Sequence, residues 1–208
     1  MPSITAAQWL EAAAYRRSVH NLAGTSGVSD ERVEEIISKV LSFAPSSYNT
    51  QPVRISLAFG EKHKQLWDVI LQTAEPVLKG INPDIWERLG PFLESHRAAY
   101  GSILFWEHTT TNKHAAETHK ATAHMFGEWG DHAQGIHQIL VWTALELEGV
   151  GANLQHMNGI PPVEAAIKKF AGVPEDYKLK AHLNYGDEKA PHPEKPAKLP
   201  IGETLTIL

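Results

Sequence analysis

The chain has 208 residues, of which 42% are hydrophobic and 21% charged, with a formal net charge of −5 at pH 7. This composition is typical of a globular protein with a sizeable core, and the acidic balance argues against general nucleic-acid binding. The absence of cysteine excludes disulfides, thiolate metal sites and thiol catalysis. Because neither a secretory signal nor an apolar run of ~18–20 residues is visible, we expect no membrane span and a cytoplasmic location, also nuclear if the source is eukaryotic.

The N-terminal half predicts three helices and one strand. The helices are expected over 5–15, 29–44 and 61–78, and the strand over 53–59. Thr5 and Ser29 can cap the first two helices, and each of these carries an apolar stripe. Pro45 ends the second helix, because the residue before a proline is pushed out of the α region. Two further prolines are expected to break the segment 80–91.

The C-terminal half predicts three strands and three helices. The strands are expected over 102–106, 152–154 and 178–185, and the helices from 113 after a loop at 109–112, over 131–147 and over 161–170. The helix over 131–147 is apolar nearly all round, so we expect it at the centre of the fold. Residues 186–208 contain four prolines and no core pattern, which predicts an extended arm or a loose tail. No repeat or linker divides the chain, so we expect a single domain over 1–208.

A polar turn follows the second predicted helix. Its short hydrogen-bonding side chains are those of Ser46, Ser47, Asn49, Thr50 and Gln51, and we call residues 46–51 the polar shelf. Such a cluster between regular elements usually satisfies its own backbone. It can also receive a planar ligand rich in heteroatoms, because a carboxamide donates to one edge atom and accepts from its neighbour. Arg54 adds a cation beside the shelf.

Two cationic motifs lie near opposite ends of the chain. Arg16, Arg17 and Ser18 follow the first predicted helix, and Lys195 and Lys198 lie in the proline-rich arm. Guanidinium groups present a fixed fork of donors to anionic oxygens, so the first motif suits a phosphate. Taken singly, two arginines complementing a helix C-terminus and a basic tail segment are the simpler interpretations.

The segment 151–158 is a third candidate, because small residues after a buried helix let a ligand approach the backbone closely. An ordinary helix-to-strand connection explains the same residues equally well. The sequence contains no Gly-x-Gly-x-x-Gly, Walker or Gly-x-Ser-x-Gly motif that would indicate a nucleotide site or a serine nucleophile.

Histidines recur at intervals of five residues in the second half of the chain. They are His114, His119, His124, His132 and His137. Five residues on a helix separate successive side chains by about 140°, whereas metal pairs prefer a spacing of four. We therefore expect surface or pocket-lining histidines and no metal site.

Three segments occur in a recognisable order and spacing. They are Arg16-Arg17-Ser18 after the first helix, Pro-Ser-Ser-x-Asn-x-Gln-Pro at 45–52, and Lys198-Leu199-Pro200 near the C-terminus. Together they resemble the FMN-dependent nitroreductase family over nearly the whole chain. The segments 102–107, 137–144 and 152–156 are similar to its compact branch, which includes the small yeast nitroreductase-like proteins linked to fatty-acid repression and bacterial relatives.

The resemblance implies an α+β fold, a three-layer α/β/α sandwich around a mixed, mostly antiparallel sheet. It also implies a homodimer with FMN in two pockets at the subunit interface and the arm 186–208 swapped onto the partner. Arg16, Arg17 and Ser18 would hold the phosphate and the ribityl chain or flavin edge. Lys198, with Lys195 beside it, would reach the phosphate. The remaining implied contacts are Ser46, Ser47, Asn49 and Gln51 from the other subunit, and the backbone around Leu154, Gln155 and His156 facing the flavin N5.

Two positions depart from the family pattern. The second basic residue, two after the serine, is His20, and a neutral imidazole supplies less charge to the phosphate or pyrimidine edge. The loop that often carries Pro-x-Glu-Gly over the flavin reads Leu-Gln-His-Met at 154–157, which agrees with the compact branch.

The resemblance implies an oxidoreductase in which NADH or NADPH reduces FMN and a nitroaromatic or quinone-like acceptor reoxidises it by a ping-pong mechanism. His156 is the candidate pocket residue that orients the substrate. Trp106 and Trp129 are candidate stacking residues, although core packing is the simpler interpretation for each. A flavin reductase of another acceptor, such as a peroxide, and a flavin-bound stress or lipid-signalling protein are the alternatives.

Overall fold

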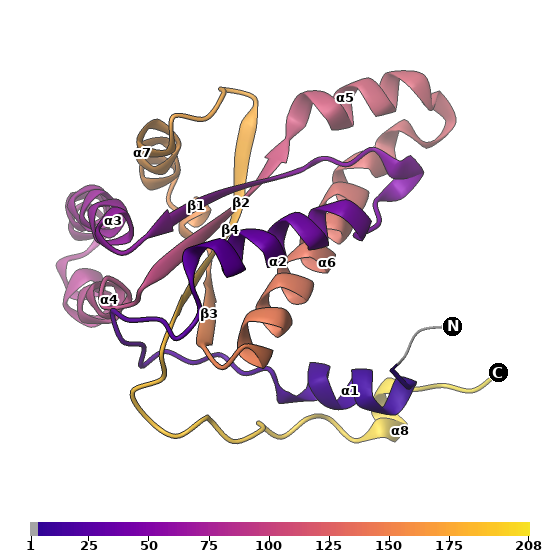
Figure 1. The fold of residues 1–208 in the computed structure, drawn as a ribbon. Coiled ribbons are helices and arrows are strands. Elements are labelled where there is room, and N and C mark those ends of the chain that lie inside the picture. Colours follow the sequence, from indigo (N-terminus) through magenta and orange to yellow (C-terminus); the bar gives the residue numbers. More distant parts are fainter. Residues whose placement is uncertain (1–3) are drawn as a thin grey trace.

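A four-stranded sheet in the order β1-β2-β4-β3 forms the middle layer of the computed structural model, which describes residues 4–208 (Figure 1). The strands are β1 Val53–Phe59, β2 Gly101–His108, β3 Gly151–Gln155 and β4 Tyr177–Gly186. All four predicted strands are confirmed, with bounds that differ by a few residues. The strand pairings in this part of the chain are antiparallel throughout, so the expected mixed sheet is not seen within one subunit.

Helices cover both faces of the sheet (Figure 1). Their bounds are α1 Ala6–Tyr15, α2 Asp30–Phe43, α3 Glu61–Ile81, α4 Pro83–His96, α5 Thr109–Thr118, α6 Phe126–Leu147, α7 Pro161–Ala171 and α8 Ile201–Thr204. Short 3-10 helices cover Ser47–Asn49 (η1), Lys120–Met125 (η2) and Met157–Gly159 (η3). Figure 1 shows α2 and α6 on one face of the sheet and α3, α4 and α7 on the other, which confirms the three-layer sandwich.

The central strand β2 is buried on both faces because its side chains alternate between the two helix layers. Ile103 and Phe105 join the cluster under α2 and α6. Leu104 and Trp106 join the cluster under α3 and α7. Trp106 is fully buried and donates its indole N–H to the Ser56 hydroxyl at 3.0 Å, so core packing is its role.

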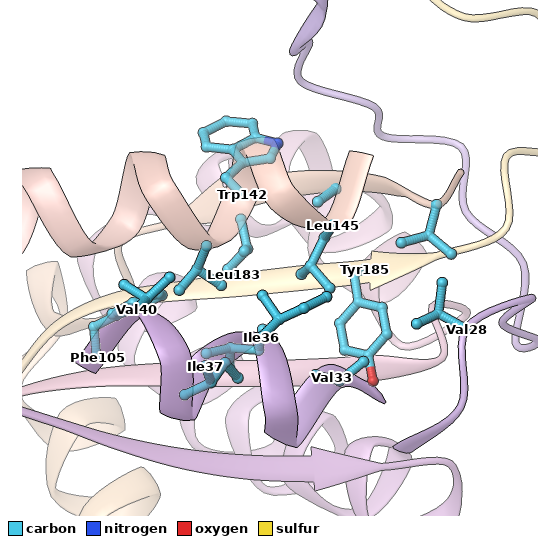
Figure 2. Packing of buried hydrophobic residues seen from close by; sticks show 14 of the residues in the cluster. Val28, Val33, Ile36, Ile37, Val40, Phe105, Trp142, Leu145, Leu183 and Tyr185 are labelled. Atoms are coloured by element: carbon cyan, nitrogen blue, oxygen red, sulfur yellow. The ribbon is translucent and has the colours of Figure 1, made fainter. Parts of the chain in front are cut away.

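Helix α2 follows its sequence signals closely. The Ser29 hydroxyl accepts the backbone N–H of Arg32 at 3.2 Å and caps the helix. Four apolar residues at helical spacing are buried, namely Val33, Ile36, Ile37 and Val40. Figure 2 shows them facing Leu183 and Tyr185 on β4. Full burial of each such side chain contributes about 1.5–3 kcal/mol.

The expected break at 80–91 is wrong, because α4 begins almost directly after α3. The Asn82 side chain accepts the N–H of Asp84 at 3.0 Å, and Pro83 lies in the first turn, where a proline is tolerated. Pro91 lies inside the helix and removes one helical hydrogen bond. Burial of Leu93 in the core outweighs this local loss.

The loop expected at 109–112 is also wrong, because α5 begins at Thr109. The backbone N–H of Thr109 donates to the Asp176 carbonyl at 2.9 Å, and the Thr110 hydroxyl donates to the Asp176 carboxylate at 2.6 Å. These contacts from the loop before β4 hold the first turn of α5.

Helix α6 is longer than predicted and is not buried all round, since Ile139 and Leu147 are 43% and 58% exposed.

Helix α1 has the predicted cap but does not reach the core. Thr5 and Gln8 form a capping box, whereas the stripe residues Trp9 and Leu10 are 54% and 59% exposed. The arm after β4 is extended, as predicted, and ends in the short helix α8. Within residues 4–208 no helix is both long and apolar enough to cross a membrane.

Candidate functional site

A cavity of about 490 Å³ lies between the end of α1, the segment that follows it and the C-terminal arm. It is lined by Ala13, Ala14, Arg16, Arg17, Ser18, Pro193, Glu194, Lys195, Pro196 and Lys198. The two cationic motifs found at opposite ends of the sequence therefore line one cavity. The arm up to Lys198 lies against α1 of its own chain, so the expected swap onto the partner is not seen for this part of the arm.

The two arginines of the cavity have different contacts. The Arg16 guanidinium lies 4.3 Å from the centre of the Trp142 ring, a cation–π arrangement. Arg17 Nη1 donates to the carbonyls of Ala14, Tyr15 and Arg16 at 2.7, 3.0 and 2.8 Å. Arg17 thus complements the C-terminus of α1, which was the simpler interpretation of this motif. The Nε atom of Arg17 is buried and has no hydrogen-bond partner within residues 4–208. Arg16 is the more available of the two for an anion.

Glu146, a buried carboxylate that the sequence analysis did not identify, holds the segment that follows α1. Glu146 accepts the backbone N–H of Arg17 at 2.8 Å and the indole N–H of Trp142 at 2.8 Å. Burial raises the pKa of Glu146 to about 7, although both hydrogen bonds act against that rise. The signal in the sequence is the spacing of four between Trp142 and Glu146 on a buried helix.

The cationic segment is joined to the edge strand β3. The Val19 N–H donates to the Ala152 carbonyl at 2.8 Å, and Asn153 Nδ2 donates to the Val19 carbonyl at 2.8 Å. Gln155 Nε2 in turn donates to Asn153 Oδ1 at 2.9 Å. The structure therefore brings the strand that ends in Leu154 and Gln155 next to the segment 16–19. His156 follows at the end of the strand with an exposed side chain.

His20 lies apart from this cavity. Its ring centroid is 5.5 Å from that of Phe92 and 6.1 Å from that of His96, both on α4. His20 does not line the cavity that holds the two cationic motifs. The structure thus separates it from Arg16 and Lys198, with which the family pattern groups it.

The polar shelf adopts an unusual backbone. Tyr48, Asn49 and Gln51 have φ angles of 52°, 53° and 52°, the left-handed region that non-glycine residues rarely adopt. The Ser46 hydroxyl accepts the Gln51 N–H at 2.8 Å, so the shelf does satisfy part of its own backbone. The side chains of Asn49 and Gln51 remain exposed, and that of Ser47 is partly exposed. Such backbone strain, which costs about 1–3 kcal/mol per residue, concentrates at ligand-binding segments.

The shelf and the cavity lie toward opposite ends of α6. Tyr48 stacks on His119 at 4.1 Å and lies within 5.9 Å of Phe126 and 5.8 Å of Trp129, at the start of the helix. Arg16, which lines the cavity, instead contacts α6 at Trp142. At 1.5 Å per residue these points are roughly 24 Å apart along the helix. One chain therefore does not bring its own shelf and its own cavity together.

The regularly spaced histidines do not form a metal centre in the part of the chain that the structure describes. His137 differs from the expectation of surface or pocket-lining side chains, because it is buried on α6 and its Nδ1 lies 2.7 Å from the Ala133 carbonyl. The polar His137 side chain can be buried because a carbonyl of the same helix supplies its hydrogen-bond partner.

Known proteins resemble this chain over most of its length. A model of the nitroreductase family matches residues 13–187. The nitroreductase FRM2 of Saccharomyces cerevisiae is 29% identical over 189 residues, which cover 90% of this chain and 91% of FRM2.

The nitroreductase CinD of Lactococcus lactis has a similar structure. Its complex with chloramphenicol gives 31% identity and a TM-score of 0.82, covering 96% of this chain and 99% of CinD. Its complex with nicotinic acid gives 30% identity and a TM-score of 0.83 over the same shares of the two chains. With one family model matching from α1 to the end of β4, the chain belongs to the nitroreductase family.

Proposed function

We propose that this protein is an FMN-dependent oxidoreductase that uses NAD(P)H to reduce nitroaromatic or quinone-like acceptors. The observation that carries the proposal is the meeting of Arg16 and Ser18 with Lys195 and Lys198 in one cavity. The complexes of CinD support the two substrate classes, because nicotinic acid shares its pyridine ring with the nicotinamide of NAD(P)H and chloramphenicol is a nitroaromatic compound.

The donors in the cavity fit the phosphate of FMN. Besides Arg17, which complements the end of α1, three cations and a hydroxyl line the cavity and can meet an anionic oxygen there. Charge-assisted hydrogen bonds of this kind are about twice as strong as neutral ones. Glu194 also lines the cavity and is the one carboxylate there, so cations still predominate. Glu146 keeps the backbone of Arg17 in place without lining the cavity itself.

The flavin ring would lie along the edge of β3 next to the phosphate site. Backbone groups at Leu154 and Gln155 are then available to the ring, and Asn153 holds the Gln155 side chain. The partner subunit would supply the polar shelf, because the shelf of the same chain lies toward the other end of α6. The proposal therefore requires a homodimer with two shared sites.

Bound FMN would supply the redox chemistry between NAD(P)H and the acceptor, and we expect ping-pong kinetics because both substrates would use the same flavin face. The chain itself binds the phosphate, orients the ring and leaves room for a planar substrate. His156 is our candidate for orienting that substrate, because its exposed imidazole directly follows the strand that faces the ring.

The absorbance spectrum of the purified protein tests the proposal. We expect a yellow protein, or one that takes up added FMN, whose flavin is bleached by NADH and recovers when a nitroaromatic compound is added. A colourless protein that does not bind added FMN would contradict the proposal. A bound flavin that neither NADH nor NADPH reduces would favour the regulatory alternative.

A further inference from the structure

The segment of the arm that carries Lys195 and Lys198 has little structure of its own. Residues 190–200 form neither helix nor strand, and all of them are exposed except His192, which is partly buried. Within residues 4–208, the hydrogen bonds and ion pairs that link residues 190–200 to residues before 190 all involve His192. Among the described residues, His192 is therefore the polar attachment point of the segment that carries both lysines.

His192 makes contacts through both ring nitrogens and through its ring face. Nδ1 lies 2.7 Å from Glu188 Oε1, and Nε2 lies 3.0 Å from the Tyr15 carbonyl oxygen. The imidazole stacks on the Tyr15 ring with centroids 4.4 Å apart and planes 1° apart. Nε2 also lies 4.0 Å from Glu146 Oε2, the carboxylate that holds the backbone of Arg17.

The geometry fixes the protonation state of this imidazole. A carbonyl oxygen and an ionised carboxylate can only accept, so both ring nitrogens must carry a proton if both hydrogen bonds are to form. Tyr15 is the last residue of α1, and the C-terminus of a helix favours a cation. A neutral imidazole carries one N–H and would lose one of the two attachments.

We propose that His192, in its doubly protonated form, is the positioning residue that holds Lys195 and Lys198 at the cavity and makes anion binding there depend on pH. This inference rests on the proposed function of the cavity as a phosphate site.

Several charged and titratable groups face the imidazole. Glu188 belongs to the arm, Tyr15 to α1 and Glu146 to α6, while Arg16 and Arg17 lie on the segment next to Glu146. Burial alone would lower the pKa of His192, but the Tyr15 carbonyl and the two carboxylates outweigh it, so the pKa is raised. The arm is therefore held while His192 is doubly protonated and is released as the pH rises through the pKa of His192.

Three variants of the full chain test the proposal by flavin fluorescence titration between pH 6 and pH 9. Wild type should bind FMN as tightly as His192→Arg at pH 6. At pH 9 wild type should bind FMN about tenfold more weakly than His192→Arg. His192→Gln, which cannot be a cation, should bind about tenfold more weakly than wild type at pH 6 and equal it at pH 9. His192→Arg keeps a permanent cation with several donors and should retain tight binding throughout. His132→Gln, at an exposed histidine of α6, is the matched control and should follow wild type.

A second measurement needs no flavin. Trypsin cleaves after Lys198, and at one fixed pH near 6 the cleavage of His192→Gln should be several times faster than that of wild type or His192→Arg. Equal cleavage rates in all variants, or FMN titrations whose pH dependence is the same in wild type and His192→Gln, would overturn the role of His192. If FMN binds no variant at any pH while cleavage still differs as expected, the arm attachment stands and the proposed function fails.

Discussion

Two buried histidines contact Ser102 on the face of the sheet covered by α3 and α4. Ser102 Oγ lies 2.7 Å from His63 Nδ1 and 2.6 Å from His182 Nε2. His63 Nε2 donates to the His96 carbonyl at 3.0 Å, whereas both ring nitrogens of His96 are buried without a partner within residues 4–208. Burial lowers the pKa of His63 and of His96 to about 4. Both side chains are therefore neutral in the native protein at neutral pH.

These histidines predict a loss of stability in acid. Because each pKa is lower in the folded than in the unfolded state, the stability they contribute is present above about pH 6.5 and is lost as the pH falls toward 4. Each should cost on the order of 3 kcal/mol by pH 4. His96→Phe removes one of them and keeps an aromatic ring between Trp67 and Phe92. Urea unfolding at pH 7 and pH 4.5 should therefore show a smaller acid loss in His96→Phe than in wild type.

The exposed variant His132→Gln is the control for this comparison and should lose as much stability in acid as wild type. Glu146, whose pKa is raised, acts in the opposite direction, but it is present in all three proteins and cancels between them. An acid loss in His96→Phe as large as that of wild type would mean that His96 is not the titrating group.

At the scale of single residues, the sequence predicts those site residues whose types already suit an anion. Arg16, Ser18 and Lys198 are of this kind, and the structure brings them together. His192 is not predictable in this way, because its partner Tyr15 lies far away in the sequence. For Glu146 the spacing of four from Trp142 indicates the indole contact, but not the contact with the Arg17 backbone. A carboxylate in a helix and a histidine in a tail have no local pattern that identifies those partners.

At the scale of elements, local signals predict a helix well when its caps and its apolar stripe agree. Helix α2 is such a case, with a serine cap and four buried residues. Helix α4 is missed because its prolines argue locally against it, and the start of α5 is expected at 113 instead of Thr109 because a run of threonines suggests a loop. The loop before β4 supplies the contacts that hold the start of α5, and burial in the core compensates for Pro91 in α4. Tertiary contacts thus outweigh local propensity.

Deleting residues 191–208 tests the arm as an element. The deletion removes His192, both lysines of the cavity and the exposed apolar residues Ile201 and Leu205 of the terminal segment. We expect FMN affinity and dimer stability to fall together, while the fold persists, because this segment contributes no residue to the core clusters. Sedimentation and flavin fluorescence over a dilution series measure both. A truncated chain that stays dimeric and binds FMN as tightly as the full chain would show that the arm serves neither role.

A mixed dimer tests whether the polar shelf serves the flavin of the partner. Arg16→Ala and Gln51→Ala should each weaken FMN about tenfold or more in homodimers. In a heterodimer of the two variants, one shared site carries both defects and the other carries none. Mixing the variants should therefore restore one tight site per dimer, measured by titration. No restoration would mean that Arg16 and Gln51 do not meet across the subunits.

At the scale of the whole molecule, α1, α2 and α6 border an apolar cleft of about 480 Å³. Its exposed apolar side chains include Trp9, Phe43, Ile139 and Leu147, which are 54%, 58%, 43% and 58% exposed. Contiguous exposed apolar surface of this kind marks an interaction site. We expect the second subunit to cover it, which also explains why α1 carries an apolar stripe without reaching the core.

Ile139→Asp should therefore convert the protein to a folded monomer, because it places a charge in the covered surface. Ile81→Asp is the matched control: Ile81 is 70% exposed at the end of α3, on the opposite helix layer. Sedimentation should show a dimer for wild type and Ile81→Asp and a monomer for Ile139→Asp. A dimeric Ile139→Asp protein would place the interface elsewhere.

The comparison of FMN with riboflavin tests the central claim most directly, because the two ligands share the flavin ring and differ in the phosphate. Wild type should bind FMN at least about 100-fold more tightly than riboflavin, since more than one cation meets the phosphate. Arg16→Ala and Lys198→Ala should each weaken FMN about 10- to 100-fold and leave riboflavin unchanged, and Arg88→Ala, at an exposed arginine of α4, should change neither. Equal affinities of wild type for FMN and riboflavin would show that the cavity between α1 and the arm does not bind the phosphate.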